Sequence, residues 1–279
     1  MTTVNFSYVD AALDNMVEGR EQSPFWRHFH WGLFPDPEVE DDSADRYFAA
    51  GEAMTERIVS AAGVTDGARV LDVGCGFGGT LDHVAQRNPG CFLTGLNIDE
   101  RQLVLARKLL AGWGRATGGE TPFVAADGCR LPVAPASLDH VLAVECIFHF
   151  PSRKSFFREA SRVLRPGGTL ALSDYVAAPG GLHRVVARMA EAGLGDDSWY
   201  GHMAKPLTSP GYERVGHSAG FDLIVDDDVN AATMPTYPAL RRLYEEAQVP
   251  EGFGQIDALE SLATSGDLTY HVLAFRKRG

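Results

Sequence analysis

Residues 70–79 read Val-Leu-Asp-Val-Gly-Cys-Gly-Phe-Gly-Gly, an apolar strand that runs directly into glycines at alternate positions. The stretch predicts a strand, a tight turn and a helix whose first amides face a ligand. Gly74, Gly76 and Gly78 carry no β-carbon that would keep such a ligand off the backbone. Asp72 stands two residues before the first glycine and brings an acidic group to the mouth of the turn. A nucleotide-binding turn beside a carboxylate is therefore expected here.

Two kinds of cofactor fit this glycine pattern. Gly74, Gly76 and Gly79 also satisfy the Gly-x-Gly-x-x-Gly pattern of dinucleotide-binding dehydrogenases. A dinucleotide phosphate is disfavoured beside a carboxylate, whereas an adenosyl cofactor that ends in an amino acid and a sulfonium is cationic and gains from Asp72. A dehydrogenase would also need a carboxylate where Asn97 stands. The acidic residue favours the cationic cofactor.

Strands and helices alternate on both sides of the turn. Strands are predicted at 69–73, 91–98, 122–126, 138–145 and 169–174, with helices at 45–62, 80–87, 100–110 and one ending at 164. This alternation is typical of an α/β fold with a mostly parallel sheet covered by helices on both faces. Residues 112–119 are expected to form a loop and 165–168 a turn.

The pattern loosens after the fifth strand. Residues 177–210 are interpreted as a lid with a short helix at 182–192, followed by a helix at 210–219, a strand at 221–229, a helix at 237–248 and a last strand at 268–276. The chain is therefore divided into an N-terminal arm (1–43), a cofactor-binding core (44–176), the lid (177–210) and a C-terminal completion of the sheet (211–279).

Composition excludes several classes of partner. The net charge of −12 argues against nucleic acid or an anionic membrane, because both require a basic face. The four cysteines show no Cys-x-x-Cys pattern, and no apolar stretch is long enough to span a bilayer, so a cytoplasmic protein is expected. His28 and His30 alternate as metal ligands could, but no further ligand is suitably spaced, and no metal site is predicted.

The motif Leu71-Asp72-x-Gly-x-Gly-x-Gly resembles the first motif of the class I S-adenosylmethionine-dependent methyltransferases, and further motifs follow in order up to about residue 175. The resemblance is to small-molecule and natural-product members, related to the ubiquinone-, menaquinone- and tocopherol-type enzymes. It implies a Rossmann-like, seven-stranded, mostly parallel sheet with an antiparallel last strand, an N-terminal helical arm and an inserted lid. It also implies S-adenosyl-L-methionine as the cofactor.

The resemblance assigns cofactor contacts residue by residue. Asp72 would bind the methionine amino group. Asn97 stands where an acidic side chain usually accepts both ribose hydroxyls, and its amide can accept from one and donate to the other. Ile98 follows it, and Gln102 either lies near the ribose and adenine or only makes a capping contact with Asp99.

The motif Ala126-Asp127-Gly128 resembles the one whose acidic residue accepts from the adenine amino group while neighbouring amides meet the ring. Glu145 ends the fourth strand and is placed among the cofactor-binding residues. The segment His30-Trp31-Gly32-Leu33-Phe34 resembles one that covers the cofactor, so Trp31 and Gly32 are expected over its methionine end, although an arm that only packs on the sheet would also fit.

Chemistry is expected where the fourth and fifth strands end. By the resemblance, His149 lies beside the transferred methyl group and Asp174 opposite, with His149 as the base and Asp174 orienting it or binding the acceptor hydroxyl. A structural histidine and a loop-capping aspartate remain alternatives. Aromatic residues of the lid and C-terminal helices would line an apolar chamber, among them Trp199, Tyr200 and Tyr244.

These expectations lead to an S-adenosylmethionine-dependent methyltransferase acting on a moderately hydrophobic small molecule, with oxygen as the favoured acceptor atom. N- and C-methylation use the same scaffold. A nicotinamide-dependent oxidoreductase, a non-catalytic cofactor-binding protein and an aminopropyl- or alkene-modifying relative are the alternatives. The motifs give no expectation for the acceptor's identity or for the oligomeric state.

Overall fold

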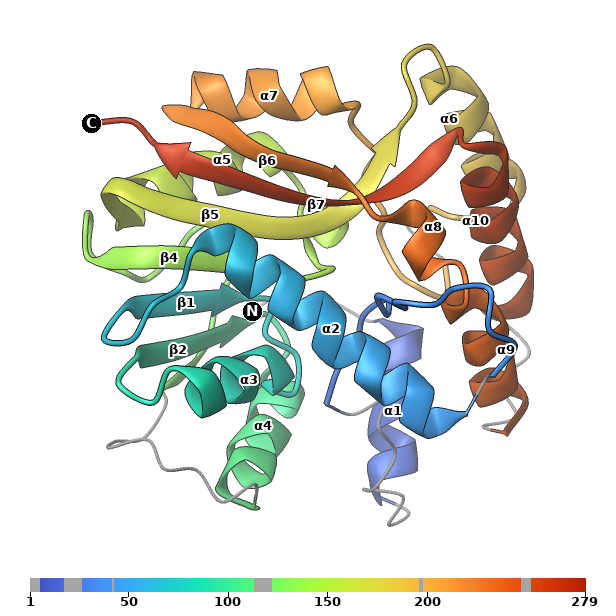
Figure 1. Ribbon diagram of the computed structural model, residues 1–279, viewed down its shortest axis with the longest axis horizontal. Helices are drawn as coiled ribbons and strands as arrows, with labels where there is room; N and C mark the ends of the chain where they lie inside the picture. The colour runs from blue at the N-terminus through green and yellow to red at the C-terminus, as the bar shows by residue number, and fades with distance from the viewer. Residues whose placement is uncertain (1–5, 18–26, 42, 113–121, 196–197, 247–251) are drawn as a thin grey trace.

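The computed structural model describes residues 6–17, 27–41, 43–112, 122–195, 198–246 and 252–279 (Figure 1). Most of the loop predicted at 112–119 lies outside this range. Among the described residues, no helix combines the length and the apolar character needed to cross a membrane.

A seven-stranded sheet forms the centre of the molecule. Its strands are β1 (Arg69–Val73), β2 (Phe92–Asn97), β3 (Phe123–Ala125), β4 (Leu138–Ala143), β5 (Leu164–Ala177), β6 (Phe221–Asp228) and β7 (Leu268–Lys277). They lie in the order β3-β2-β1-β4-β5-β7-β6. Neighbours pair in parallel from β3 to β5, whereas β7 is antiparallel to both β5 and β6. The predicted fold class, including the antiparallel last strand, is confirmed.

Helices cover both faces of the sheet. They are α1 (Ser7–Val17), α2 (Ala44–Ala62), α3 (Gly79–Arg87), α4 (Glu100–Gly112), α5 (Arg153–Val163), α6 (Leu182–Glu191), α7 (Ser209–Ser218), α8 (Asn230–Thr233), α9 (Thr236–Glu246) and α10 (Phe253–Ser265). Apolar side chains of α2, α3 and α4 form one core with the sheet, and those of α5 and α7 form a second. The helices predicted on both faces of the sheet are therefore present, and each set buries an apolar face against the sheet.

The fifth strand begins earlier than expected. Residues 165–168, predicted as a turn, continue β5, which starts at Leu164. The pairing with β4 is irregular between Leu138 and His140, and Gly167 has a φ of 79°. A glycine at positive φ lets the strand bulge instead of turning.

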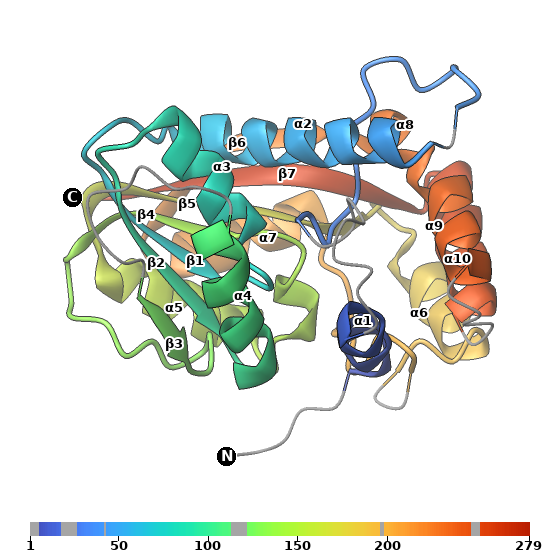
Figure 2. The ribbon, with the colours of Figure 1, turned by 90° about the horizontal axis from the view of Figure 1, so that it is seen from below.

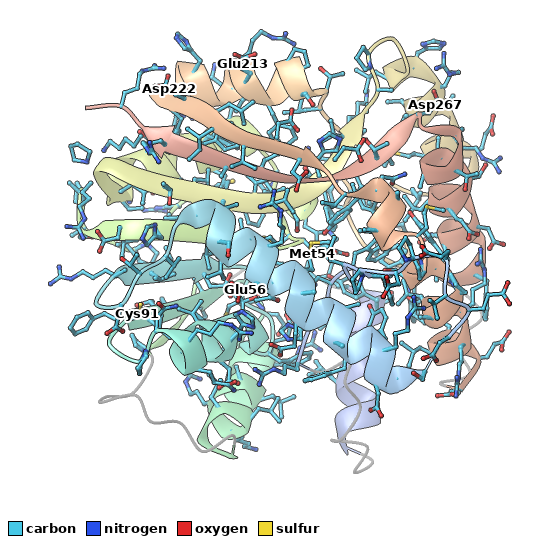
Figure 3. The ribbon with its side chains drawn as sticks, in the orientation of Figure 1. Met54, Glu56, Cys91, Glu213, Asp222 and Asp267 are labelled. Atoms are coloured by element: carbon cyan, nitrogen blue, oxygen red, sulfur yellow. The ribbon has the colours of Figure 1, made fainter. Side chains whose placement is uncertain are left out.

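The carboxyl ends of the parallel strands point toward one side of the molecule. Figures 1 and 2 both place α1 on that side, between the sheet and the pair formed by α9 and α10. Helix α6 lies beyond the end of β5, where its Arg184 pairs with Asp267, which is labelled in Figure 3. Ligands of open α/β sheets bind at such carboxyl edges, so α1, α6, α9 and α10 border the region where the predicted site lies.

Candidate active site

The glycine-rich turn after β1 has the backbone that its sequence predicts. Gly74, Gly76 and Gly78 have φ values of 77°, 51° and 88°, a region that favours glycine. A β-carbon at Gly74 would lie 2.6 Å from Cβ of Cys146, so this glycine is required for packing between strands. A β-carbon at Gly76 would meet no atom within 4 Å, and this part of the turn therefore faces open space.

Asp72 is a buried carboxylate whose oxygens lack hydrogen-bond partners. The residue is only 1% exposed, and neither carboxylate oxygen has a hydrogen-bond partner among the described residues. Burial raises its pKa to about 7. The residue lines a cavity of about 330 Å³ together with Gly74, Gly76 and Thr80. A cationic group in this cavity would supply the partner that Asp72 lacks, so the residues present fit the ammonium end of S-adenosylmethionine.

The N-terminal arm covers this cavity, but with residues slightly before those predicted. Arg27, Phe29 and His30 line it. Gly32 instead packs on α2 and α9, since its N–H donates to Thr236 Oγ1 and a β-carbon there would lie 2.7 Å from Cβ of Ala50. The structure thus places the covering segment at 27–30 and corrects the position expected for Gly32.

A buried polar network fastens the arm to α2 and α3. His30 and His28 both contact Oγ1 of Thr55, at 3.0 and 3.1 Å. His28 also contacts Glu52, at 2.5 Å, and the other oxygen of Glu52 lies 2.7 Å from Nδ1 of His83. Burial lowers the pKa of His30 to about 3, so its imidazole is neutral.

The network extends to Glu56, which lies between α2 and α3 in Figure 3 and contacts His83 Nε2 at 2.9 Å. Arg27 joins it by donating to Glu52 and Asp82. Apart from His30, these residues belong to no sequence motif, and the network was not predicted. The only indication of the network in the sequence was the number of polar residues on helix faces that are buried.

At the end of β2, Asn97 is held by its neighbours. Its Oδ1 accepts from the Ile98 amide at 2.7 Å, and its Nδ2 donates to Oε1 of Gln102 at 2.8 Å. Gln102 therefore orients Asn97 and does not cap the helix through Asp99. Oδ1 of Asn97 also accepts from the Asp99 amide at 3.4 Å, so the side chain still has one N–H to donate to a ribose. Ile98 is 44% exposed, an apolar surface suited to a planar ring.

The predicted adenine motif follows β3, beside β2. The Ala126 amide donates to the Asn97 carbonyl at 3.0 Å, which places the motif at the same edge of the sheet. Asp127 is exposed, and its Oδ1 accepts from the Cys129 amide at 2.7 Å. Gly128 is buried, and a β-carbon there would lie 2.9 Å from the Phe150 ring. The structure therefore gathers Asp127 and Asn97 at neighbouring strand ends.

A second cavity of about 530 Å³ adjoins the first. It is lined by Tyr8, Phe29, His30, Trp31, Tyr47, Glu145, Phe148, His149, Tyr175, Tyr200, Met203, Leu240, Tyr244 and Leu259. We call it the acceptor chamber. Phe29 and His30 line both cavities, so the two meet at the arm. An apolar chamber with few polar groups is typical of a small-molecule site.

His149 is a candidate base in this chamber. Its Nδ1 lies 2.8 Å from the His202 carbonyl oxygen, to which it donates, and this contact leaves the lone pair on Nε2. The Tyr8 hydroxyl lies 3.2 Å from Nε2 and donates to it. Desolvation lowers the pKa of His149 to about 4, so the imidazole is neutral near pH 7. This arrangement can accept a proton from a hydroxyl that takes the place of Tyr8.

Asp174 does not reach the acceptor chamber, which corrects the predicted pair. It is fully buried, and its Oδ2 accepts from Arg153 at 2.8 Å and from the Tyr212 hydroxyl. Its Oδ1 accepts from the Tyr175 amide. Because all these partners lie in β5, α5 and α7, the carboxylate joins the sheet to two helices and neither orients His149 nor faces an acceptor.

Glu145 lies in the acceptor chamber and not in the cavity of Asp72. Its φ of 47° is uncommon for a residue other than glycine. Its Oε2 accepts from the Trp31 amide at 2.7 Å and from the Tyr270 hydroxyl at 2.6 Å. Desolvation raises its pKa to about 8. Glu145 thus ties the arm, through Trp31, to the sheet.

Comparisons with known proteins agree with this site. A family model described as "Methyltransferase domain" matches residues 71–172. The chain is 36% identical over 217 residues to methyltransferase GfsG of Streptomyces halstedii, covering 77% of this chain and 73% of the relative. It is 31% identical over 207 residues to the 27-O-demethylrifamycin SV methyltransferase of Amycolatopsis mediterranei, covering 74% and 72%.

Among solved structures, a geranyl diphosphate methyltransferase in complex with SAM superposes with a TM-score of 0.72, at 18% identity and over 90% of this chain and 98% of that one. At this identity the likeness concerns the fold alone. The sequence relatives, the matched domain and the unpaired Asp72 carboxylate carry the assignment. The chain belongs to the class I S-adenosylmethionine-dependent methyltransferases, with S-adenosyl-L-methionine as its cofactor.

Proposed function

We propose that this enzyme transfers a methyl group to a hydroxyl oxygen of a moderately hydrophobic small molecule. The observation that carries the proposal is the neutral His149, whose Nε2 accepts from the Tyr8 hydroxyl and can accept from an acceptor hydroxyl that replaces it. The residue lines an apolar chamber that meets the cofactor cavity at Phe29 and His30. A relative named as a 27-O-demethylrifamycin SV methyltransferase supports oxygen as the acceptor atom.

The cofactor-binding roles follow from the contacts. Asp72 binds the methionine ammonium, because it is a buried carboxylate without another partner. Asn97 and Gln102 hold the ribose, and Ile98 with Ala126, Asp127 and Gly128 surrounds the adenine. The arm residues Arg27, Phe29 and His30 close the cavity against water.

When bound, S-adenosylmethionine supplies an electrophilic methyl group on a good leaving group. The chain's own residues then align the acceptor oxygen with that methyl and receive its proton at Nε2 of His149. An oxygen–carbon bond forms, a carbon–sulfur bond breaks, and the hydroxyl proton ends on the imidazole. Alignment alone provides effective molarities of about 10⁵ to 10⁸ M, so positioning in the chamber supplies much of the acceleration.

We also propose the division into arm, core, lid and C-terminal part at 1–43, 44–176, 177–210 and 211–279, with the arm and lid acting as covers. A small-molecule acceptor is the proposed partner, and the net charge of −12 speaks against nucleic acid. The cysteines at positions 75, 91, 129 and 146 are free thiols, which supports a cytoplasmic location.

The test is mass spectrometry of the protein incubated with trideuteriomethyl S-adenosylmethionine and a metabolite extract of its source organism. A product that carries the label on oxygen, absent with heat-inactivated protein, is the expected result. Label only on nitrogen or carbon would contradict O-methylation. No labelled product, together with binding of S-adenosylhomocysteine, would favour a non-catalytic role.

A further inference from the structure

Tyr175 lines the acceptor chamber and carries a buried hydroxyl that the proposed mechanism does not use. The residue follows Asp174 on β5, is only 5% exposed and lines the chamber. Its hydroxyl is buried and finds no hydrogen-bond partner in the described part of the chain. Buried hydroxyls are ordinarily paired, and an unpaired one lowers the stability of the fold. A buried, unpaired hydroxyl at this position is explained if a bound ligand forms a hydrogen bond with it.

The Tyr175 hydroxyl is a hydrogen-bond donor at neutral pH. Burial, followed by electrostatic repulsion from Tyr237, Glu145 and Tyr270, raises its pKa well above the usual value, so the group stays protonated.

We propose that the Tyr175 hydroxyl is a subsite that binds a carbonyl oxygen of the acceptor, separate from the hydroxyl that His149 deprotonates. A protonated phenol hydroxyl is a donor, and a carbonyl oxygen only accepts. The subsite restricts acceptors to hydroxylated ring systems that also carry a ketone or ester, and it orients them for transfer. This inference rests on the proposed function, because it assumes that the chamber holds the acceptor.

The test compares two probes that differ only at the carbonyl: 6-hydroxyflavanone, and 6-hydroxyflavan, which has a methylene in that place. Binding of each is measured by isothermal titration calorimetry with S-adenosylhomocysteine present. The wild-type protein is expected to bind the ketone at least about fivefold more tightly, the usual effect of one hydrogen bond. Tyr175→Phe, which keeps the ring, is expected to bring the ratio close to one without lowering the melting temperature.

Tyr47→Phe is the matched control. Tyr47 also lines the chamber, but its hydroxyl already donates to the His30 carbonyl at 3.1 Å. Its loss should lower the melting temperature and leave the preference for the ketone unchanged. A wild-type ratio near one, or a wild-type ratio retained in Tyr175→Phe, would overturn the subsite. Label transfer from the cofactor is measured separately, so a failed subsite and a failed methyltransferase assignment give different results.

Discussion

Replacing Asp72 by Asn should stabilise the ligand-free protein and remove its affinity for the cofactor. The residue is 1% exposed, both carboxylate oxygens lack partners among the described residues, and burial raises its pKa from 3.8 to about 7. Opposite effects on stability and binding are expected of a group that is kept for a ligand.

The magnitude follows from proton linkage. A carboxyl whose pKa is higher in the folded than in the unfolded protein favours folding at low pH, and this contribution is lost as the pH rises from about 4 to about 7. The difference between about 7 and 3.8 corresponds to about 4 kcal/mol. Asn keeps the shape without the charge, but its amide is also unpaired at a cost of about 1–3 kcal/mol. We therefore expect Asp72→Asn to gain about 1–3 kcal/mol at pH 8, where the linkage contribution exceeds the amide cost, and to lose about 1–3 kcal/mol at pH 4, where only the amide cost remains.

Urea denaturation of both proteins at pH 4, 6 and 8 measures this difference, and calorimetry with S-adenosylhomocysteine measures binding. Asp127→Asn is the matched control, because Asp127 is exposed and the amide oxygen can still accept from Cys129. It should weaken binding without a pH-dependent change in stability. An Asp72→Asn protein that is less stable than wild type at pH 8, or that binds S-adenosylhomocysteine normally, would refute the reasoning.

Three further substitutions test the rest of the site. Asp174→Asn leaves Arg153 without its buried partner and should cost about 3–5 kcal/mol in urea denaturation, with normal S-adenosylhomocysteine affinity in the folded protein; unchanged stability with lost turnover would restore a catalytic role. Gly79→Ala places a β-carbon 1.6 Å from the Arg27 carbonyl oxygen, so the arm must move and calorimetry should show at least about tenfold weaker cofactor binding; wild-type affinity would show that the arm does not cover the cofactor. Glu52→Gln weakens the contacts with Arg27 and two histidines, which should lower the melting temperature and the cofactor affinity together. If neither changes, Glu52 does not hold the arm on α2 and α3.

Much of the fold could be predicted from local sequence. The apolar run before Gly74 and the alternation of strands and helices were sufficient for the sheet, since short-range patterns determine these elements. Helix α10 was missed although Ile256, Leu259 and Leu262 have helical spacing and are buried. The turn expected at 165–168 was wrong because Gly167 serves a bulge in a strand that its partner β4 stabilises.

The site was predictable only where one short motif determines the geometry. Asp72 near the end of β1 and the glycines of the turn that follows are adjacent in sequence, and the structure has the strand and the turn that were expected. The predicted role of Asp174 was wrong because its partners, Arg153 and Tyr212, belong to two helices distant in the sequence, and no local pattern links them to it. The segment that covers the cofactor cavity lies a few residues earlier than predicted, because the network around Glu52 determines its position. Such tertiary contacts leave no local pattern in the sequence.

The most direct test of the account is single-turnover methyl transfer by wild type and His149→Ala. It uses trideuteriomethyl S-adenosylmethionine and the acceptor identified from the extract. The account predicts a rate about 10²- to 10⁴-fold lower in His149→Ala with unchanged S-adenosylhomocysteine affinity. Because the pKa of His149 is about 4, it also predicts a wild-type rate that this group does not limit above about pH 5. Equal rates in the two proteins, or an equal loss of rate and cofactor affinity, would contradict the assignment of His149 as the base.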